Sequence, residues 1–228
     1  MAESHSAESG LPSMFDTLRS LPLFRGASAE DISLLVEKIP LEFDSCARGE
    51  EVVASGCRCD RLIILLSGNV SQKTRVASGR IVLSQLHGAG FCVAPDSLFG
   101  LYNDSSSAIV AETDVSLLRI SKGNLLELLE MSRIYLVNYL NMLSFRAQMR
   151  RMVAQTPRVP RVYSYIRQLM RALGERRAIE TRVLFSAKDM ARELGIDEAR
   201  VIRQLRALAS HENVRIDGTP ARLAVILK

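Results

Sequence analysis

The sequence has no long apolar run and few histidines, and its first 45 residues contain no cysteine. None of its apolar stretches approaches the ~18 consecutive residues that a membrane-spanning helix needs. The opening residues MAESHSAESG also lack the basic and apolar regions of a signal peptide. We therefore expect a soluble protein of the cytoplasm that has no membrane partner.

The three histidines are widely separated along the chain, which leaves little material for general-base chemistry. The sequence shows no metal-binding triad, phosphate-binding loop or pairing of a nucleophile with a base. These absences predict that the protein is not an enzyme.

Charge is distributed unevenly between the two ends of the chain. Residues 155–228 contain 15 lysines and arginines against 8 acidic residues, whereas residues 1–154 contain 15 against 17. The C-terminal part therefore carries a net charge of +7 and the rest carries −2. This excess favours a polyanionic partner such as double-stranded DNA, although a basic segment can also be ordinary solvated surface.

Two short helices joined by a sharp turn are predicted within residues 185–211. Ser186 can cap the first helix, with Asp189 three residues later to complete a capping box. Gly195 tolerates the positive φ of a helix C-terminus, and Asp197 can cap the second helix. The turn is about three residues long, as a helix-turn-helix needs. The apolar stripe of the first helix is Ala187, Met190, Ala191 and Leu194.

The second helix has an apolar and a basic side, since successive residues are ~100° apart. The side that packs on the first helix carries Val201, Leu205 and Leu208. The opposite side carries Ala199, Arg200, Arg203 and Arg206. A small residue among arginines suits close approach to a DNA groove, where a guanidinium can pair with guanine or contact phosphate. The alternative is an ordinary pair of helices with solvated charges.

A β-hairpin is predicted to follow, with strands at residues 214–216 and 222–226 and a turn at Asp217-Gly218. Asn213 can close the helix before it. The whole segment therefore reads as a winged helix-turn-helix, with Arg215 and Arg222 placed to reach phosphates. The predicted DNA-binding residues are Lys188, Glu198, Ala199, Arg200, Arg203, Arg206, Arg215 and Arg222.

The period of apolar residues changes after Pro40, and glycines separate several short β-rich runs. Several short strands at this spacing predict an antiparallel β-sandwich or β-roll. Ser28 begins a short amphipathic helix before them, which ends near Ile39. The clearest β-rich runs are Val52–Val53, Leu62–Leu66, Ile81–Leu86 and Val115–Ile120.

Ser121 can cap a helix to about Glu130, and a longer helix is predicted from about Ser132 to Ala154. The longer helix is apolar on two sides, so one side can pack on the roll while the other meets a second copy of the chain. The alternative is a helix enclosed within one monomer. The predicted dimer seam is Leu136, Leu140, Leu143 and Ala147. The predicted roll-facing residues are Ile134, Val137, Met142, Phe145, Met149 and Met152.

These patterns predict an α+β fold divided into four parts. Residues 1–12 are expected to be flexible, and residues 13–131 to form a sensory β-roll with flanking helices. Residues 132–156 are expected to form the dimerisation helix, and residues 157–228 the DNA-binding domain, beginning with a connecting helix from Arg161 to Leu173.

Short motifs at characteristic spacings run along nearly the whole chain. They are Leu23-Phe24 with Ser28–Asp31, Gly49, Gly56, Leu65–Val70, Leu143-Ser144 with Arg146–Gln148, Met190–Gly195 and Val201–Leu205. In order and spacing they resemble the cyclic-AMP receptor and fumarate–nitrate regulator (CRP/FNR) family of bacterial transcription factors. The resemblance implies a homodimer with an effector-binding roll like a cyclic nucleotide-binding domain, a long dimerisation helix and a DNA-binding head. RNA polymerase is implied as a further partner.

The sequence departs from that family where cyclic nucleotides bind. Family members hold the ribose with a Gly-Glu pair and the cyclic phosphate with an Arg-Ser/Thr-Ala run. Here Pro95 takes the glutamate position and Ser106 the arginine position, followed by Ser107 and Ala108. A lost charge-assisted hydrogen bond costs about 1.5–3 kcal/mol, so an effector other than cyclic AMP is expected. The candidate effector pocket is Phe91, Pro95, Leu98, Ser106, Ser107 and Phe145.

The predicted recognition helix departs from the family more mildly. Arg203 matches an arginine that most members keep, but Ala199 takes the usual acidic position and Glu198 precedes it. Glu198 can accept a hydrogen bond from cytosine, or simply favour the helix N-terminus electrostatically.

The four cysteines are Cys46, Cys57, Cys59 and Cys92. Family members that sense oxygen through an iron–sulfur cluster use a compact N-terminal cysteine run, which this sequence lacks, so a cluster is not expected. Free or structural thiols are the main interpretation, with a redox or metal role as the alternative.

His87 is the one histidine within the predicted roll. Some related regulators of the nitrosative-stress response use haem, and an axial ligand here would be His87, a cysteine, Met142, Met149 or Met152. The alternative is a polar loop histidine and a methionine stripe that belongs to the core. Two functions stay open: a DNA-binding transcription regulator, and a ligand-sensing or protein-interaction module whose helical tail does not bind DNA.

Overall fold

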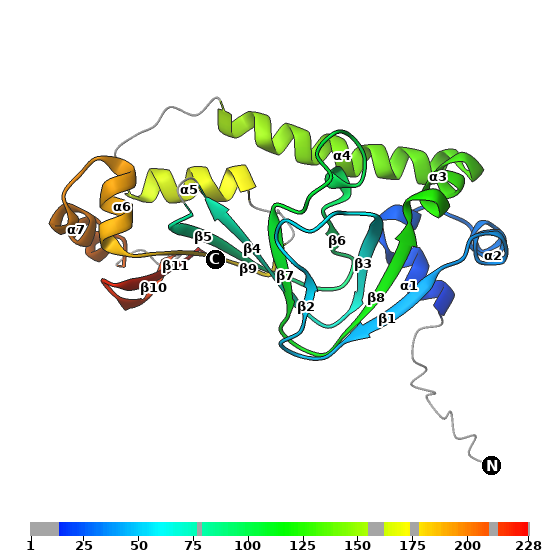
Figure 1. Ribbon diagram of the computed structural model, residues 1–228, viewed down its shortest axis with the longest axis horizontal. Coiled ribbons are helices and arrows are strands. Elements are labelled where there is room, and N and C mark those ends of the chain that lie inside the picture. Colours follow the sequence, from blue (N-terminus) through cyan, green and yellow to red (C-terminus); the bar gives the residue numbers. More distant parts are fainter. Residues whose placement is uncertain (1–13, 77–78, 155–161, 174–177, 210–213, 228) are drawn as a thin grey trace, which may run out of the picture.

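The computed structural model describes residues 14–76, 79–154, 162–173, 178–209 and 214–227. The segment 1–12, expected to be flexible, lies outside these ranges, as do Arg161 and Asn213. Figure 1 shows the strands in the middle of the molecule, the longest helix along one side of them, and the last two helices at one end.

The helices of the N-terminal part flank its strands. They are α1 (Met14–Ser20), α2 (Ala29–Lys38), α3 (Lys122–Met131) and α4 (Arg133–Ala154), with short 3-10 turns η1 (Pro22–Phe24) and η2 (Pro95–Ser97). The strands are β1 (Glu42–Cys46), β2 (Glu51–Val53), β3 (Arg61–Ser67), β4 (Val70–Val76), β5 (Ile81–His87), β6 (Cys92–Val93), β7 (Ser107–Ala111) and β8 (Val115–Ser121). The C-terminal part contains α5 (Val162–Leu173), β9 (Glu180–Phe185), α6 (Ala187–Leu194), α7 (Glu198–Leu208), β10 (Val214–Thr219) and β11 (Arg222–Leu227).

The strands form two antiparallel sheets. One has the order β1-β8-β3-β6 and the other β10-β11-β9-β5-β4-β7-β2. The predicted antiparallel roll is therefore confirmed. β3 shows why it closes into a core: Ile63 and Leu65 face the interior of the roll, while Leu62 and Ile64 face the N-terminal helices. A strand buried on both faces reads as a continuous apolar run, which made β3 recognisable in the sequence.

The predicted helix caps are present. Ser28 Oγ accepts from the Asp31 amide at 3.1 Å, and Asp31 Oδ2 accepts from the Ser28 amide at 2.9 Å, which completes the capping box of α2. Ser121 caps α3 through the Asn124 amide at 3.2 Å. These caps fix where the helices begin on either side of the roll.

The inner side of α4 is anchored by tyrosines. Tyr135 and Tyr139 are 1% and 3% exposed, and their hydroxyls donate to Asp31 O at 3.2 Å and to Pro95 O at 2.8 Å. Val137 is 43% exposed, so the prediction that it faces the roll is wrong. The reason is the helical period: Tyr135, Tyr139 and Met142 define the buried side of α4, and Val137 lies away from it. Phe145 lies at the edge of that side and is 37% exposed.

The C-terminal part continues the sheet of the roll. β9 pairs antiparallel with β5 from Val82↔Leu184 to Leu86↔Glu180. Beneath α5, residues of β4 and β5 share one apolar core with residues of β9, α6, α7 and β11. The sequence does not predict this pairing, because the two strands are far apart in the chain and the apolar pattern of each does not specify which strand it pairs with.

The two helices near the C-terminus follow the sequence prediction closely. Ser186 and Asp197 cap α6 and α7, and Gly195 has φ +66° between them. The predicted turn at Asp217-Gly218 is wrong, because β10 continues to Thr219, which pairs with Arg222. Gly218 instead permits a close approach of the strands at φ +104°, where a Cβ would lie 2.1 Å from Arg222 O. Within the described residues, no helix is both long and apolar enough to span a membrane.

Candidate functional site

A cavity of about 760 Å³ lies where the N-terminal segment, the β5–β6 loop and α4 meet the residue before β9. Its lining is mixed apolar and polar. The residues are Ser20, Pro22, Arg25, His87, Gly88, Ala89, Gly90, Phe91, Cys92, Pro95, Asn138, Asn141, Met142, Phe145, Arg146 and Ile179. The lining therefore comes from the N-terminal segment, the roll, α4 and the residue before β9.

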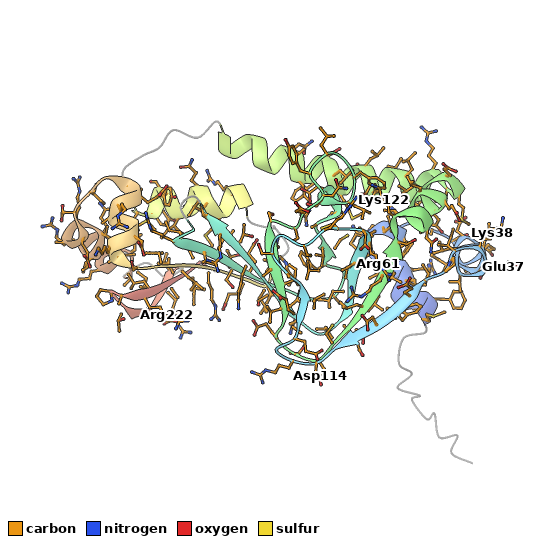
Figure 2. All side chains as sticks on the ribbon, viewed as in Figure 1. Glu37, Lys38, Arg61, Asp114, Lys122 and Arg222 are labelled. Carbon is orange, nitrogen blue, oxygen red and sulfur yellow. The ribbon has the colours of Figure 1, made fainter. Side chains whose placement is uncertain are left out.

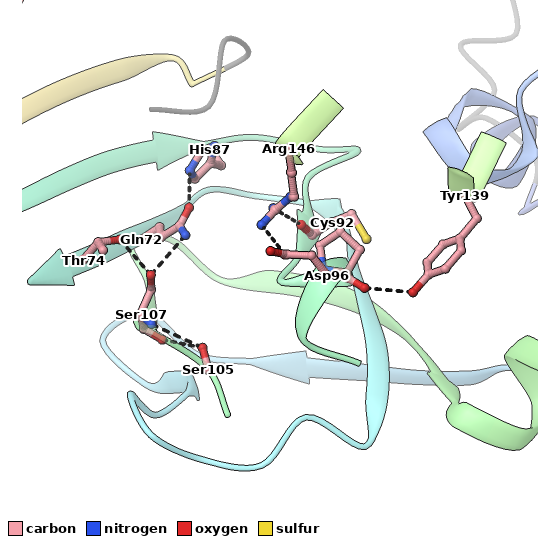
Figure 3. A network of polar contacts seen from close by, with 10 residues as sticks. Gln72, Thr74, His87, Cys92, Asp96, Ser105, Ser107, Tyr139 and Arg146 are labelled. Atoms are coloured by element: carbon pink, nitrogen blue, oxygen red, sulfur yellow. Dashed lines mark hydrogen bonds and ion pairs between the residues drawn. The ribbon is translucent and has the colours of Figure 1, made fainter. Parts of the chain in front are cut away.

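Arg146 ties α4 to the roll beside this cavity. Its guanidinium donates to Asp96 Oδ1 at 2.9 Å and to the Cys92 carbonyl at 3.1 Å, as Figure 3 shows. The two charged side chains are only 16% and 14% exposed. Because charges removed from water need a partner, this ion pair holds η2 and β6 against the helix.

Tyr139 makes the neighbouring link between α4 and η2. Its hydroxyl donates to Pro95 O, and its ring meets Phe99 edge-on with centroids 6.2 Å apart. Burial raises the pKa of Tyr139 above its usual value, with smaller contributions from Cys92 and Asp96, so the hydroxyl remains a donor.

His87 lies buried at the inner wall of the cavity. Its ring stacks on Phe91 at 3.8 Å between centroids, and its Nε2 lies 3.1 Å from Gln72 Oε1. Burial, followed by the charge of Arg146, lowers the pKa of His87 from 6.5 to about 3. The imidazole is therefore neutral at physiological pH, and its Nε2–H donates to Gln72 because the amide nitrogen of Gln72 donates elsewhere.

A row of polar contacts continues from His87 into the roll (Figure 3). Gln72 Nε2 donates to Ser107 Oγ at 3.3 Å, and this hydroxyl shares a second hydrogen bond of 2.7 Å with Thr74. Ser105 Oγ donates to the Ser107 carbonyl at 2.8 Å. The Ser107 side chain is thus engaged within the protein.

Only some of the candidate effector-pocket residues lie together around this cavity. Phe91, Pro95 and Phe145 line the cavity. Leu98 is 1% exposed within the N-terminal core, and Ser106 is exposed to solvent. The sequence analysis did not predict Arg25, Asn138 or Arg146 as pocket residues. For Asn138 and Arg146, a polar residue on the side of α4 that carries buried residues could have indicated a site.

The residues proposed as haem ligands were tested against this geometry. His87, Cys92 and Met142 line the cavity, and the side chains of Met149 and Met152 lie outside those described. His87 is 1% exposed, its ring stacks on Phe91, and its Nε2 is hydrogen-bonded to Gln72. Iron at Nε2 would have to replace the hydrogen bond to Gln72, so the arrangement does not fit a haem axial ligand at that nitrogen.

The cysteines are free thiols. Burial raises the pKa of the Cys46 and Cys59 thiols, which makes them less reactive than an exposed cysteine. In the part of the chain that is described, no three histidine, cysteine or acidic side chains are grouped so that they could hold a metal ion.

A second candidate surface lies at the C-terminal end. Val201, Leu205 and Leu208 of α7 are buried, and the arginines on the other side of the helix are exposed. Figure 2 shows Arg222 at the same end of the molecule as α6 and α7. The exposed candidate DNA-binding residues are Lys188, Glu198, Ala199, Arg200, Arg203, Arg206, Arg215 and Arg222.

The outer side of α4 is an uncovered apolar surface. Leu136 and Leu140 are 39% and 49% exposed, and Ala147 is also exposed. Leu143 differs from the other seam residues, because it is partly buried against the N-terminal core.

Comparison with known proteins matches these parts to a fold. The family model described as the cyclic nucleotide-binding domain matches residues 43–132, which include most of the roll and α3. No curated protein matches the chain. The N-terminal half therefore has the fold of a cyclic nucleotide-binding domain.

Among solved structures, the catabolite activator protein of Thermus thermophilus is 22% identical, with a TM-score of 0.50, over 91% of this chain and 93% of that chain. The N-terminal domain of a transcriptional regulator from Streptomyces coelicolor A3(2) is 25% identical, with a TM-score of 0.45, over 58% and 93%. The sensor domain of the transcriptional regulator DNR from Pseudomonas aeruginosa is 18% identical, with a TM-score of 0.46, over 58% and 91%. At 22% identity, the similarity to the Thermus thermophilus protein supports the fold and not the function.

Proposed function

We propose that the protein is a homodimeric, sequence-specific DNA-binding transcription regulator of the CRP/FNR type, and not an enzyme. In this proposal α6, α7 and the β10–β11 hairpin form a winged helix-turn-helix. The roll senses an effector other than cyclic AMP, and RNA polymerase is a further partner. The observation that carries the proposal is the division of α7 into a buried apolar side and an exposed arginine side.

The arrangement of α7 suits a recognition helix. Arg200 and Arg203 lie in its first two turns and are exposed, and Ala199 leaves room for close approach. Side chains in the N-terminal half of a recognition helix contact base edges in the major groove. Arg203 is therefore assigned to base reading, and Arg206, one turn further, to phosphate.

The hairpin has the place of a wing. Arg222 begins β11 and is exposed, and Arg215 on β10 is 67% exposed at its side chain. Asp217 lies 3.0 Å from Arg215 Nε and neutralises part of its charge. Arg222 is thus the better candidate for a sequence-independent phosphate contact.

The dimer is supported by α4. A helix with one side anchored by buried tyrosines and the other side apolar and exposed needs a covering partner, and a twofold-related α4 presents the same surface. Two helices in a dimer then reach successive major grooves about one helical turn apart.

The exclusion of cyclic AMP rests on the residues around Ser107. Ser106 is exposed and has no positive charge, and the Ser107 hydroxyl is already shared between Gln72 and Thr74. A cyclic phosphate at this place would lack a guanidinium and would displace existing hydrogen bonds.

Gel-shift titration with DNA from upstream of the protein's own coding region tests the function. A dimer that uses three basic side chains per protomer makes six phosphate contacts and should lose about 10³ in affinity between 50 and 200 mM salt. Absence of binding at low salt would instead support a sensory or interaction module whose C-terminal helices contact protein.

A further inference from the structure

We propose that the cavity between α4, the β5–β6 loop and Ile179 binds a small organic anion with an apolar body. This inference rests on the proposed function in one respect, since it takes this ligand to be the effector. The binding site itself is argued from the cavity alone.

The cavity has the size and composition of a small-molecule site. Its volume of about 760 Å³ lies within the roughly 300–1,000 Å³ typical of such pockets. Apolar side chains from four separate segments line it, and a smaller number of polar groups converge between them. They are Pro22, Phe91, Met142, Phe145 and Ile179 on the apolar side, and Ser20, Arg25, Asn138, Asn141 and Arg146 on the polar side.

The charge of the lining selects an anion. The lining residues in the described part of the chain include two arginines and no aspartate or glutamate. Arg146 is paired with Asp96, which is not among the lining residues, whereas Arg25 is exposed and forms no ion pair with a described residue. His87 is neutral and does not change this balance. Arg25 is therefore the group that can pair with an incoming carboxylate, sulfonate or phosphate.

The apolar part of the lining favours a ligand that carries an apolar group as well as its negative charge. Phe145 and Ile179 are 37% and 62% exposed, although both border the cavity. A ligand that covers them removes apolar surface from water, which inorganic phosphate or sulfate cannot do. The preferred ligand is thus an aromatic or aliphatic acid.

Ile179 connects this site to the C-terminal part. Its amide donates to Leu86 O at 2.7 Å, beside the Leu86↔Glu180 pair that ends the β5–β9 ladder. Its Cδ1 also lies against Gly88 of the β5–β6 loop. Since β9 leads through Phe185 directly into α6, a ligand that displaces Ile179 acts on the strand that positions the two helices.

Fluorescence titration of the full chain with 8-anilinonaphthalene-1-sulfonate tests the site without DNA. This probe has an aromatic body and a sulfonate, and the uncharged N-phenyl-1-naphthylamine is its matched control. We expect about one sulfonate probe per chain, bound at least tenfold more tightly than the uncharged probe. Equal affinity for both would overturn the choice of an anion.

Variants locate the probe. Arg25→Glu and Asn141→Trp should each weaken binding at least tenfold, the first through charge and the second by filling the cavity, because both residues are exposed and line it. Arg48→Glu changes the net charge equally at an exposed site outside the lining and should have no effect. Equal effects of Arg25→Glu and Arg48→Glu would place the probe elsewhere and overturn the proposal.

Hydrogen exchange tests whether ligand binding in the cavity affects β9, separately from whether the ligand binds. Probe binding should change the exchange of the β9 amides, residues 180–185, and unchanged exchange would overturn the coupling. If the probe binds as described but the protein binds no DNA, the cavity remains a ligand site and the proposed function fails. If DNA binds but no probe does, the function stands and the cavity proposal fails.

Discussion

Replacing Leu140 tests the dimer at the centre of its predicted seam. The side chain is 49% exposed on the outer side of α4, so about half of it remains to be buried by a partner. Full burial of a leucine stabilises by about 1.5–3 kcal/mol, and half of this is about 1 kcal/mol per protomer. The twofold axis repeats the contact, which makes the total about 2 kcal/mol.

Leu140→Ala should therefore raise the dimer dissociation constant about 30-fold, as about 2 kcal/mol corresponds to this factor. Leu140→Lys should do more, because it also places two like charges opposite each other, and should give monomers. Sedimentation velocity over a range of concentrations measures both. Circular dichroism of the variants checks that the roll is still folded.

Leu126→Lys provides the matched control. Leu126 is 47% exposed but lies on α3, outside the predicted seam. Its replacement should leave the dimer intact. A Leu140→Lys protein that sediments as the wild type, or a Leu126→Lys protein that dissociates equally, would refute the assignment of the α4 seam.

Three further predictions concern the sensory part. Because His87 has a pKa of about 3 in the folded protein and about 6.5 unfolded, the unfolded chain binds the extra proton as pH falls below 6.5. The free energy of unfolding should thus fall toward low pH, and His87 alone should account for about 2 kcal/mol of this loss at pH 5. Urea titrations of His87→Gln at several pH values should show a weaker pH dependence than the wild type, and an equal dependence would contradict the burial of a neutral ring. Arg146→Ala removes the guanidinium from the largely buried Asp96, which is 14% exposed, and should lower the free energy of unfolding by about 3 kcal/mol. Arg61→Ala, which breaks the exposed pair with Glu42, should cost under about 1 kcal/mol. If the two cost the same, the Arg146–Asp96 pair does not hold η2 to the helix. Calorimetry should detect no binding of cyclic AMP or cyclic GMP by the wild type or by Ser106→Arg, since the ribose contact is also missing; tight binding by the wild type would overturn the alignment at Pro95 and Ser106.

Local signals in the sequence predicted much of the fold. Ser28, Ser186 and Asp197 mark helix starts because a short polar side chain satisfies free backbone amides, and all three act as caps. Gly195 marks the helix end because it accepts a positive φ. Such signals need only a few neighbouring residues, and this is why they can be read from one sequence.

Features that depend on distant residues were not predictable. The β5–β9 pairing joins strands whose own patterns specify burial but no partner. The Asp217-Gly218 signal for a turn was overridden, because the hairpin extends to Thr219 and Arg222 and uses the glycine for close strand approach. Arg146 gains its role from Asp96, which lies 50 residues away in the chain. The cavity that Arg146 borders was therefore predicted only in part, through Phe91, Pro95 and Phe145.

The most direct test of the central claim is a randomised-site selection with the wild type and two arginine variants. Arg203 on α7 is assigned to a base edge, and Arg222 on β11 to a phosphate. The wild type should select two half-sites about one helical turn apart. Arg203→Ala should cost about 1–3 kcal/mol and lose preference at one base pair per half-site, while Arg222→Ala should weaken binding to all sequences alike and lower the salt slope by about one. Full sequence preference retained by Arg203→Ala would contradict the recognition-helix assignment and favour a module that does not read DNA.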